Sequence, residues 1–271
     1  MTNDVHLGLQ SSDEIDTTVS HSARVWDYWL DGKEHYPVDQ EVGDRITEFL
    51  PDAGRQARAA RVFLGRVVRF LAGEAGVRQF LDVGPGLPTV DNTHEVAQRA
   101  APDARVVYAD NDPLVVAHAR ALLTGGPAGA THCVEADLRE PATIIRGARG
   151  PLDLTRPVAV ILCCVLCHLL DDEAYAAIEE LTAALAPGSY VALADVTMVV
   201  SRDRMTGARR YWNRHGAPPV AVRSPAQLAW FLRGLDLVAP GLVTCTRWRP
   251  EADPFGVPEA IDLYGGVGRK P

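Results

Sequence analysis

Several features that mark common classes of protein are scarce in this sequence. Lysine occurs only at Lys33 and Lys270, and the excess of acidic residues gives a net charge of −8. Because nucleic-acid backbones are bound by a broad basic face, we expect no nucleic-acid partner. The longest apolar run, 158–167, has ten residues, which is about half of a membrane span. The polar N-terminus also lacks a signal-peptide core, so we expect a cytoplasmic protein with no membrane partner.

Cysteine is also sparse, and this argues against a disulfide-bonded protein and against a cysteine metal site. The five cysteines are odd in number and irregularly spaced, so they form no disulfide framework. Three of them lie in CCVLC at 163–167. We place Cys163 and Cys164 on one strand, where adjacent side chains point to opposite faces. No paired CxxC motif completes a tetrahedral metal site, so we expect small core residues and no metal.

Length and composition favour one enlarged α/β domain. The chain has 271 residues, of which 47% are hydrophobic, enough to bury a full core. We divide it into a flexible N-terminus over 1–20 and a single domain over 21–271. Within the domain, 21–55 is expected to form an N-terminal helical lid. The basic, proline-containing stretch 201–222 is expected to be an insertion before the last helix and strands.

Strands and helices are expected to alternate through the middle of the chain. Near-continuous apolar runs such as VAVILCCVL indicate strands buried on both faces of a parallel sheet. The expected strands are 79–83, 105–109, 131–134, 157–164 and 190–194, and the expected helices are about 92–100, 113–123 and 172–185.

The segments on either side of this alternating region also predict secondary structure. Before it, helical spacing over 55–73 predicts one buried face made of Val62, Phe63, Val67, Phe70 and Leu71. After it, Ser224 followed by Pro225 is typical of a helix start. Two closing strands are expected at 236–245 and 261–267.

The stretch FLDVGPGLPTVDNTHE, residues 80–95, is the most informative in the chain. An apolar strand ends at Asp82, a turn follows with Gly84 and Gly86, and the next segment can begin a helix. Glycine lets the backbone approach a ligand closely, and a helix start offers free amide groups. A dinucleotide site would have a third glycine, but Thr89 stands there and Pro88 removes an amide donor.

Acidic residues at successive strand ends favour a cationic nucleoside ligand over a pyrophosphate. Asp82 would repel a pyrophosphate but attract the ammonium and sulfonium groups of S-adenosylmethionine. Asp110, with Asn111 beside it, stands where a ribose would need an acid, and Asp137 where an adenine amino group could donate. Each acid could instead serve only a turn or a cap.

The candidates for chemistry lie after the later strands and in the N-terminal block. His168 and Asp195 follow the fourth and fifth strands, where sites in such sheets lie. His168 is the candidate base, although it could simply bind a loop carbonyl, and Asp195 could have only a turn role. In the lid, Tyr28 is one of several aromatic residues that could cover a sulfonium, and Lys33 could contact a carboxylate.

Taken together, the sequence resembles a family of S-adenosylmethionine-dependent methyltransferases that is widespread in actinobacteria, whose members mostly lack an assigned substrate. The resemblance rests on ARVWDYWLDGKEHYPVDQ, FLDVGPGLPTVDNTHEVAQ, RVVYADNDPLVVAHARALL, EADLREP, RPVAVILCCVLCHL, LAPGSYVALADV, LVAPGLV with WRP, and YGGVGRK. It implies the class I methyltransferase fold, a Rossmann-like α/β architecture. Such a fold has a seven-stranded, mostly parallel sheet with helices on both faces.

The resemblance also implies roles for individual residues. Asp82, Gly84 and Gly86 would line the methionine end of the cofactor, Asp110 the ribose and Asp137 the adenine. The family pattern near the fourth strand reads Val-Leu-His, whereas Cys167 here precedes His168.

We therefore expect S-adenosylmethionine-dependent methyl transfer to an O or N nucleophile on a small molecule. Two alternatives stay open from the sequence. One is a non-catalytic regulatory protein that binds S-adenosylmethionine or a nucleoside. The other is an NAD-dependent oxidoreductase.

Overall fold

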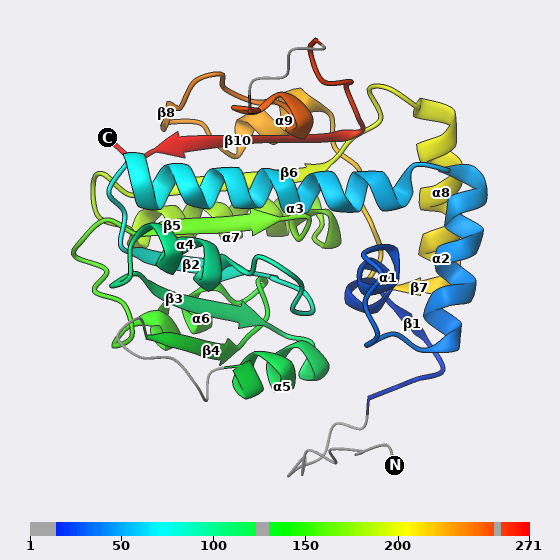
Figure 1. The fold of residues 1–271 in the computed structure, drawn as a ribbon, viewed down its shortest axis with the longest axis horizontal. Coiled ribbons are helices and arrows are strands. Elements are labelled where there is room, and N and C mark those ends of the chain that lie inside the picture. The colour runs from blue at the N-terminus through cyan, green and yellow to red at the C-terminus, as the bar shows by residue number, and fades with distance from the viewer. Residues whose placement is uncertain (1–14, 123–129, 252–255) are drawn as a thin grey trace.

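A central β-sheet organises the computed structural model, which describes residues 15–122, 130–251 and 256–271 (Figure 1). Within these residues the strand order is β4-β3-β2-β5-β6-β10-β8, with β9 also paired to β10. The parallel strands are β2 (Gln79–Val83), β3 (Arg105–Asp110), β4 (Thr131–Glu135), β5 (Ala159–Cys163) and β6 (Tyr190–Val196), and β10 (Leu263–Arg269) runs antiparallel. The five predicted parallel strands are confirmed to within a few residues. Because the strand order reverses between β2 and β5, a ligand crevice is expected at their carboxyl ends.

The last edge strand differs from its prediction. The sequence suggests one strand over 236–245, whereas the structure contains β8 (Asp236–Leu237) and β9 (Val243–Thr244). Between them, Pro240 has no amide hydrogen for a ladder, and Gly241 turns the chain with a φ of 86°. Both short strands pair with β10, so together they occupy the edge position that the seven-stranded class I methyltransferase sheet requires.

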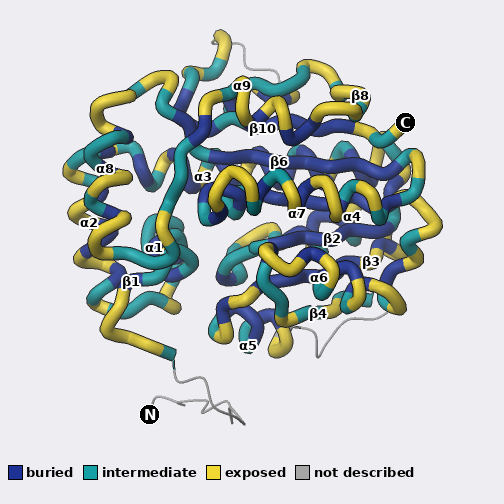
Figure 2. Tube along the Cα trace, turned by 180° about the vertical axis from the view of Figure 1, so that it is seen from behind, coloured by how far each residue is buried: buried dark blue, intermediate teal, exposed yellow. Residues whose placement is uncertain are grey.

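Helices cover both faces of the sheet (Figures 1 and 2). The helices α3 (Ala53–Arg69) and α4 (Thr93–Ala100) lie on one face, and α6 (Pro141–Ala148) and α7 (Asp171–Ala184) lie on the other. The other elements of the body are α5 (Pro113–Leu122), α9 (Pro225–Trp230) and the short helical turns η1 (Phe70–Glu74), η2 (Leu166–His168) and η3 (Cys245–Arg247). Ser224 caps α9 as predicted, because its Oγ accepts from the amide of Gln227 at 3.3 Å.

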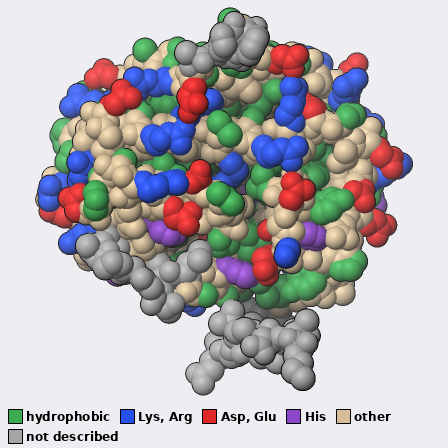
Figure 3. All heavy atoms as spheres, viewed as in Figure 1, with side chains coloured by type: hydrophobic (Ala, Val, Ile, Leu, Met, Phe, Trp, Pro, Cys, Tyr) green, Lys and Arg blue, Asp and Glu red, His purple; other side chains and the backbone are tan. Residues whose placement is uncertain are grey.

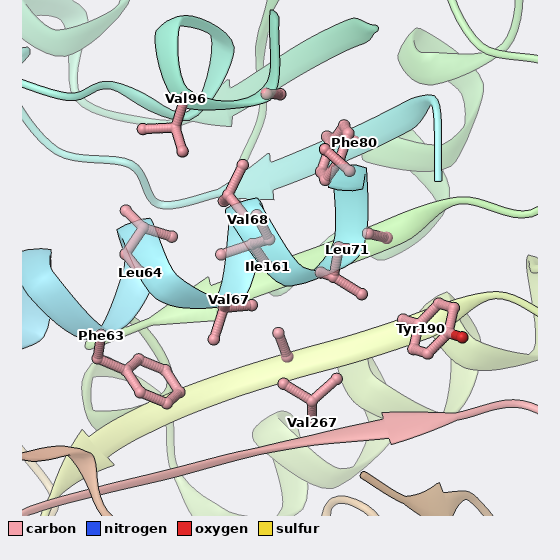
Figure 4. Packing of buried hydrophobic residues seen from close by; sticks show 14 of the residues in the cluster. Phe63, Leu64, Val67, Val68, Leu71, Phe80, Val96, Ile161, Tyr190 and Val267 are labelled. Atoms are coloured by element: carbon pink, nitrogen blue, oxygen red, sulfur yellow. The ribbon is translucent and has the colours of Figure 1, made fainter. Parts of the chain in front are cut away.

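Helix α3 packs along the sheet and supplies much of the core on its face (Figure 4). Phe63, Val67 and Leu71 are buried at i, i+4 spacing, as predicted. Val62, which the sequence analysis placed on the same face, is 53% exposed. One residue turns a helix by about 100°, so Val62 points away from the surface that its neighbour Phe63 buries.

The N-terminal block and the predicted insertion pack together at the carboxyl ends of the parallel strands (Figure 1). We call residues 20–50 and 201–222 the cap. It contains α1 (Ser22–Trp29), α2 (Pro37–Phe49) and α8 (Arg202–His215), together with the parallel pair β1 (Ser20–His21) and β7 (Gly216–Ala217). The stretch 201–222 is thus mainly helix α8, which packs against α2.

The cap has a small hydrophobic core of its own. Val25 and Ile46 from its first two helices pack with Met205 and Trp212 from α8. The flexible segment predicted over 1–20 falls mostly outside the described residues, but Ser20 is fully buried in β1.

The surface carries charges of both signs. Basic and acidic side chains are interspersed over the face shown in Figure 3.

Among the helices that the structure describes, none is long and apolar enough to span a membrane.

Candidate functional site

A cavity of about 290 Å³ lies where the parallel strands end beneath the cap. Its walls come from the ends of β2, β3, β4 and β5, from α3, and from the cap residues His21, Trp26 and Pro218. We call it the strand-end cavity. It occupies the crevice that the strand order predicts, and the cofactor residues predicted at successive strand ends meet there.

The glycine turn after β2 has a conformation that other residues adopt poorly. Gly84 has a φ of 67° and Gly86 a φ of 69°, both in the left-handed region. A Cβ added to Gly84 would lie 2.4 Å from Val165 Cγ2, whereas one added to Gly86 would meet no protein atom within 4 Å. Both glycines line the cavity, so the turn exposes bare backbone to a ligand.

Asp82 and Arg61 place an acidic and a basic side chain in the wall of the same cavity. Asp82 is 3% exposed, and its Oδ2 accepts a hydrogen bond from Thr93 Oγ1 at 2.6 Å, which ties β2 to α4. Burial raises the pKa of Asp82 to about 6, and the positive charge of Arg61 opposes that rise. Arg61 Nε is buried and has no hydrogen-bond partner among the described residues. A zwitterionic group would satisfy both side chains.

Asp110 and Asp137 follow the next two strands. Asp110 Oδ1 accepts from the amide of Asp112 at 2.9 Å, and burial raises the pKa of Asp110 to about 6. Asp137 is more exposed, and its Oδ2 accepts from Asn111 Nδ2 at 2.9 Å and pairs with Arg139. Both acids therefore have the local turn contacts that the sequence allowed, and both also line the cavity.

His168 is placed by η2 at the cavity wall, just beyond β5. Its Nδ1 lies 3.2 Å from the carbonyl oxygen of Pro219, which can only accept a hydrogen bond. Burial lowers the pKa of His168 to about 4, so the ring is neutral near pH 7. With the proton on Nδ1, Nε2 is left as a proton acceptor. The carbonyl contact and a role as base are thus compatible.

The cysteine pair does not alternate as predicted. Strand β5 ends at Cys163, and Cys164 follows with a φ of 59°. Because this backbone conformation leaves the pleat, both cysteines line the strand-end cavity. Among the described residues, no group of three His, Cys, Asp or Glu side chains is arranged to hold a metal ion.

Asp195 lies on β6 beneath the site and does not line the cavity. The side chain is 1% exposed, and its Oδ1 accepts from the amide of Val196 at 2.8 Å. Its Oδ2 is buried and faces the thiol of Cys167. Burial raises the pKa of Asp195 to about 6. The geometry therefore gives no support to Asp195 as a catalytic residue.

Two predicted cofactor contacts in the cap lie outside the cavity wall. Tyr28 points to α2, where its hydroxyl donates to Asp44 Oδ1 at 2.6 Å, and Lys33 is exposed. Trp26, which is two residues before Tyr28, lines the cavity instead. Sequence reasoning also missed His21, whose Nδ1 lies 2.9 Å from Asp112 Oδ2 and joins the cap to the end of β3. No sequence signal marked His21 or Arg61.

Comparison with known proteins decides which family uses this arrangement. A family model described as S-adenosyl methyltransferase matches residues 9–271. This chain belongs to that family. It is an S-adenosylmethionine-dependent methyltransferase of the class I fold. The expected resemblance to an actinobacterial family is thereby confirmed.

Solved structures agree with this assignment. A DUF574 family protein from Streptomyces avermitilis MA-4680 is 41% identical, with 95% of this chain and 100% of that chain covered and a TM-score of 0.90. A structure from Thermobifida fusca YX is 37% identical, covers 94% of this chain and 96% of its own, and has a TM-score of 0.87. Magnesium protoporphyrin IX methyltransferase from Synechocystis PCC 6803, solved with bound S-adenosylhomocysteine, shares the fold at 15% identity, coverage of 91% and 93%, and a TM-score of 0.53. No curated protein matches the chain.

The residues of the strand-end cavity fit the cofactor of this family. Its methionine end carries an ammonium and a carboxylate, which complement Asp82 and the unpartnered Nε of Arg61. The bare backbone at Gly84 and Gly86 gives close access, and Asp110 offers an acceptor at the next strand end. When bound, the cofactor supplies an electrophilic sulfonium methyl group.

Proposed function

We propose that this methyltransferase methylates an oxygen or nitrogen atom of a small molecule. The observation that supports this is the position of the strand-end cavity between the sheet and the cap, with neutral His168 in its wall. A cap over the site limits the access of water and helps to hold two reactants at short range. A small acceptor fits beneath such a cap more readily than a macromolecule.

Roles follow from where each side chain lies in the cavity. We assign the ammonium of the cofactor to Asp82 and its carboxylate to Arg61. Asp110 would accept from the ribose hydroxyls, and Asp137 with Asn111 would face the adenine. This order runs along the strand ends β2, β3 and β4, so an elongated ligand can contact all of them.

The reaction is a displacement in which the methyl carbon–sulfur bond breaks as a carbon–oxygen or carbon–nitrogen bond forms. The acceptor must lose one proton during or after this step. His168 Nε2 can receive that proton, because Nδ1 is committed to the Pro219 carbonyl. The proton then passes to solvent, and the sulfur keeps the bonding electron pair as a thioether.

Calorimetric titration with S-adenosylhomocysteine tests the cofactor assignments. We expect saturable binding that weakens by about tenfold or more in Asp110→Ala, because a hydrogen bond to a charged group is lost. Lys33→Ala is the matched control and should bind as the parent does, since Lys33 is exposed outside the cavity wall. Saturable binding of NAD without binding of S-adenosylhomocysteine would contradict the proposal.

An acceptor screen separates catalysis from a purely regulatory role. Release of S-adenosylhomocysteine would be followed with a panel of phenols, alcohols and amines. A positive acceptor should lose turnover in His168→Gln while cofactor affinity is kept. If no acceptor raises turnover above solvent hydrolysis, the non-catalytic alternative is favoured.

A further inference from the structure

A second cavity, of about 110 Å³, lies between the cap and the body of the protein, next to the strand-end cavity. We call it the cap cavity. Four residues, Ser22, Trp26, Cys164 and His168, line both cavities and therefore form a shared wall. A ligand in the cap cavity would touch the same side chains as a ligand in the strand-end cavity.

The cap cavity is almost entirely apolar. Of the described residues that line it, only Ser22, Gln56, His168 and Arg209 have strongly polar side chains. Gln56 Nε2 donates to Asp52 Oδ2 at 3.2 Å, and Arg209 is exposed. Ser22 and His168 both belong to the shared wall, so polar side chains gather on the side that adjoins the strand-end cavity. An acceptor bound here would therefore turn its polar end to the strand-end cavity and its apolar body to the cap.

Aromatic side chains shape the apolar end. The indole rings of Trp26 and Trp29 meet edge to face at 6.3 Å, and Trp212 lines the cavity from α8. Such surfaces favour flat aromatic ligands, which pack in offset or edge-on geometry. The volume limits ligand size, because an apolar protein cavity of about 150 Å³ takes up benzene. At about 110 Å³ the cap cavity is smaller still, so it has room for no more than one ring.

We propose that the cap cavity is the acceptor site and that the acceptor is a single apolar aromatic ring with its nucleophilic oxygen or nitrogen at the shared wall. This proposal rests on the proposed function, because it assigns the acceptor side of the same reaction. His168 then lies beside the nucleophile, and Trp26, which lines both cavities, can contact the ring and the cofactor.

Binding of p-cresol to the protein saturated with S-adenosylhomocysteine tests the proposal. We expect saturable binding of p-cresol and none of myo-inositol, a polar ring of comparable size. Ala57→Met places added bulk in the cap cavity, since Ala57 is 1% exposed and lines it. This variant should weaken p-cresol binding by about tenfold and leave S-adenosylhomocysteine affinity within about twofold.

A control variant, Val62→Met, and a second test variant, Trp29→Ala, accompany Ala57→Met. Val62→Met adds the same side chain on the same helix at an exposed position outside both cavities, so p-cresol should bind as before. If Ala57→Met does not fold, Trp29→Ala provides the test. Removing the indole should let 2-naphthol bind at least about tenfold more tightly than it binds the parent.

The outcomes distinguish the two proposals. Failure to bind S-adenosylhomocysteine would contradict the proposed function itself. Normal cofactor binding with no saturable p-cresol binding would overturn only the acceptor proposal. Equal p-cresol affinity in the parent and Ala57→Met would also overturn it, as would tight 2-naphthol binding by the parent.

Discussion

Replacing Gly84 by alanine tests whether the turn after β2 is fixed by steric packing. Gly84 has a φ of 67°, and its added Cβ would lie 2.4 Å from Val165 Cγ2 and 2.7 Å from Val165 Cβ. Gly86 offers a matched control in the same turn. It has nearly the same φ, at 69°, but an added Cβ would meet no protein atom within 4 Å.

The two substitutions should lower the free energy of unfolding by amounts that differ only by the cost of overpacking at Gly84. A left-handed conformation costs a residue with a side chain about 1–2 kcal/mol. Forcing a methyl group into a filled space adds about 1–3 kcal/mol. We therefore expect Gly84→Ala to lower the free energy of unfolding by about 2–5 kcal/mol and Gly86→Ala by about 1–2 kcal/mol. A loss at the upper end is a large share of the stability of a typical domain.

Urea unfolding of the ligand-free protein, followed by circular dichroism, measures both values. Val165→Ala in the Gly84→Ala background removes both Cγ atoms, so it should recover part of the loss relative to Val165→Ala alone. Equal losses for Gly84→Ala and Gly86→Ala, or no recovery in the double variant, would refute the packing argument.

Three further predictions concern the buried acid, the histidine and a helix cap. Burial raises the pKa of the Asp195 carboxyl from 3.8 to about 6. The unfolded chain therefore ionises this group first, and the free energy of unfolding should fall progressively as the pH rises from about 4 to about 6. Asp195→Asn should therefore match the parent near pH 4 and exceed it by up to about 3 kcal/mol near pH 8 in urea unfolding; a difference independent of pH would contradict this. Because the pKa of His168 is lowered to about 4, the imidazole should cause no change in kcat/KM between about pH 5.5 and 7.5. A pKa near 6.5 in the pH profile of kcat/KM would argue against a neutral imidazole at His168. Ser224→Ala should cost about 1 kcal/mol, because Ser224 accepts from the Gln227 amide, and an unchanged urea midpoint would show that the cap contributes nothing.

The sheet could be predicted from the sequence because its parallel strands coincide with apolar runs. The sequence predicts β2 with its observed bounds, and it predicts β5 to within two residues at each end. The glycine turn and the acids that follow it are local signals. The sequence shows each of them directly. Their meeting in one cavity then follows because parallel strands end at the same edge of a sheet.

The cap could not be predicted in the same way. Helix α8 buries only Met205, Ala208 and Trp212 among many arginines, so its pattern looked like a solvated insertion. The sequence also does not show how α1 is rotated, and it therefore cannot tell whether Tyr28 or Trp26 faces the cavity. Residues two positions apart lie about 200° apart around a helix, so only one of them can face the cavity. The φ of 59° at Cys164 is likewise set by tertiary structure.

The short parallel pair β1–β7 has a consequence for how the protein reaches its active form. It joins Ser20 to Gly216 and His21 to Ala217, residues separated by about two hundred positions in the chain. Contacts of such long range form late in folding, because the intervening chain must first be ordered. We therefore expect the sheet to assemble before the cap closes over it. A nascent chain would have the carboxyl ends of its parallel strands in place well before the cap covered them.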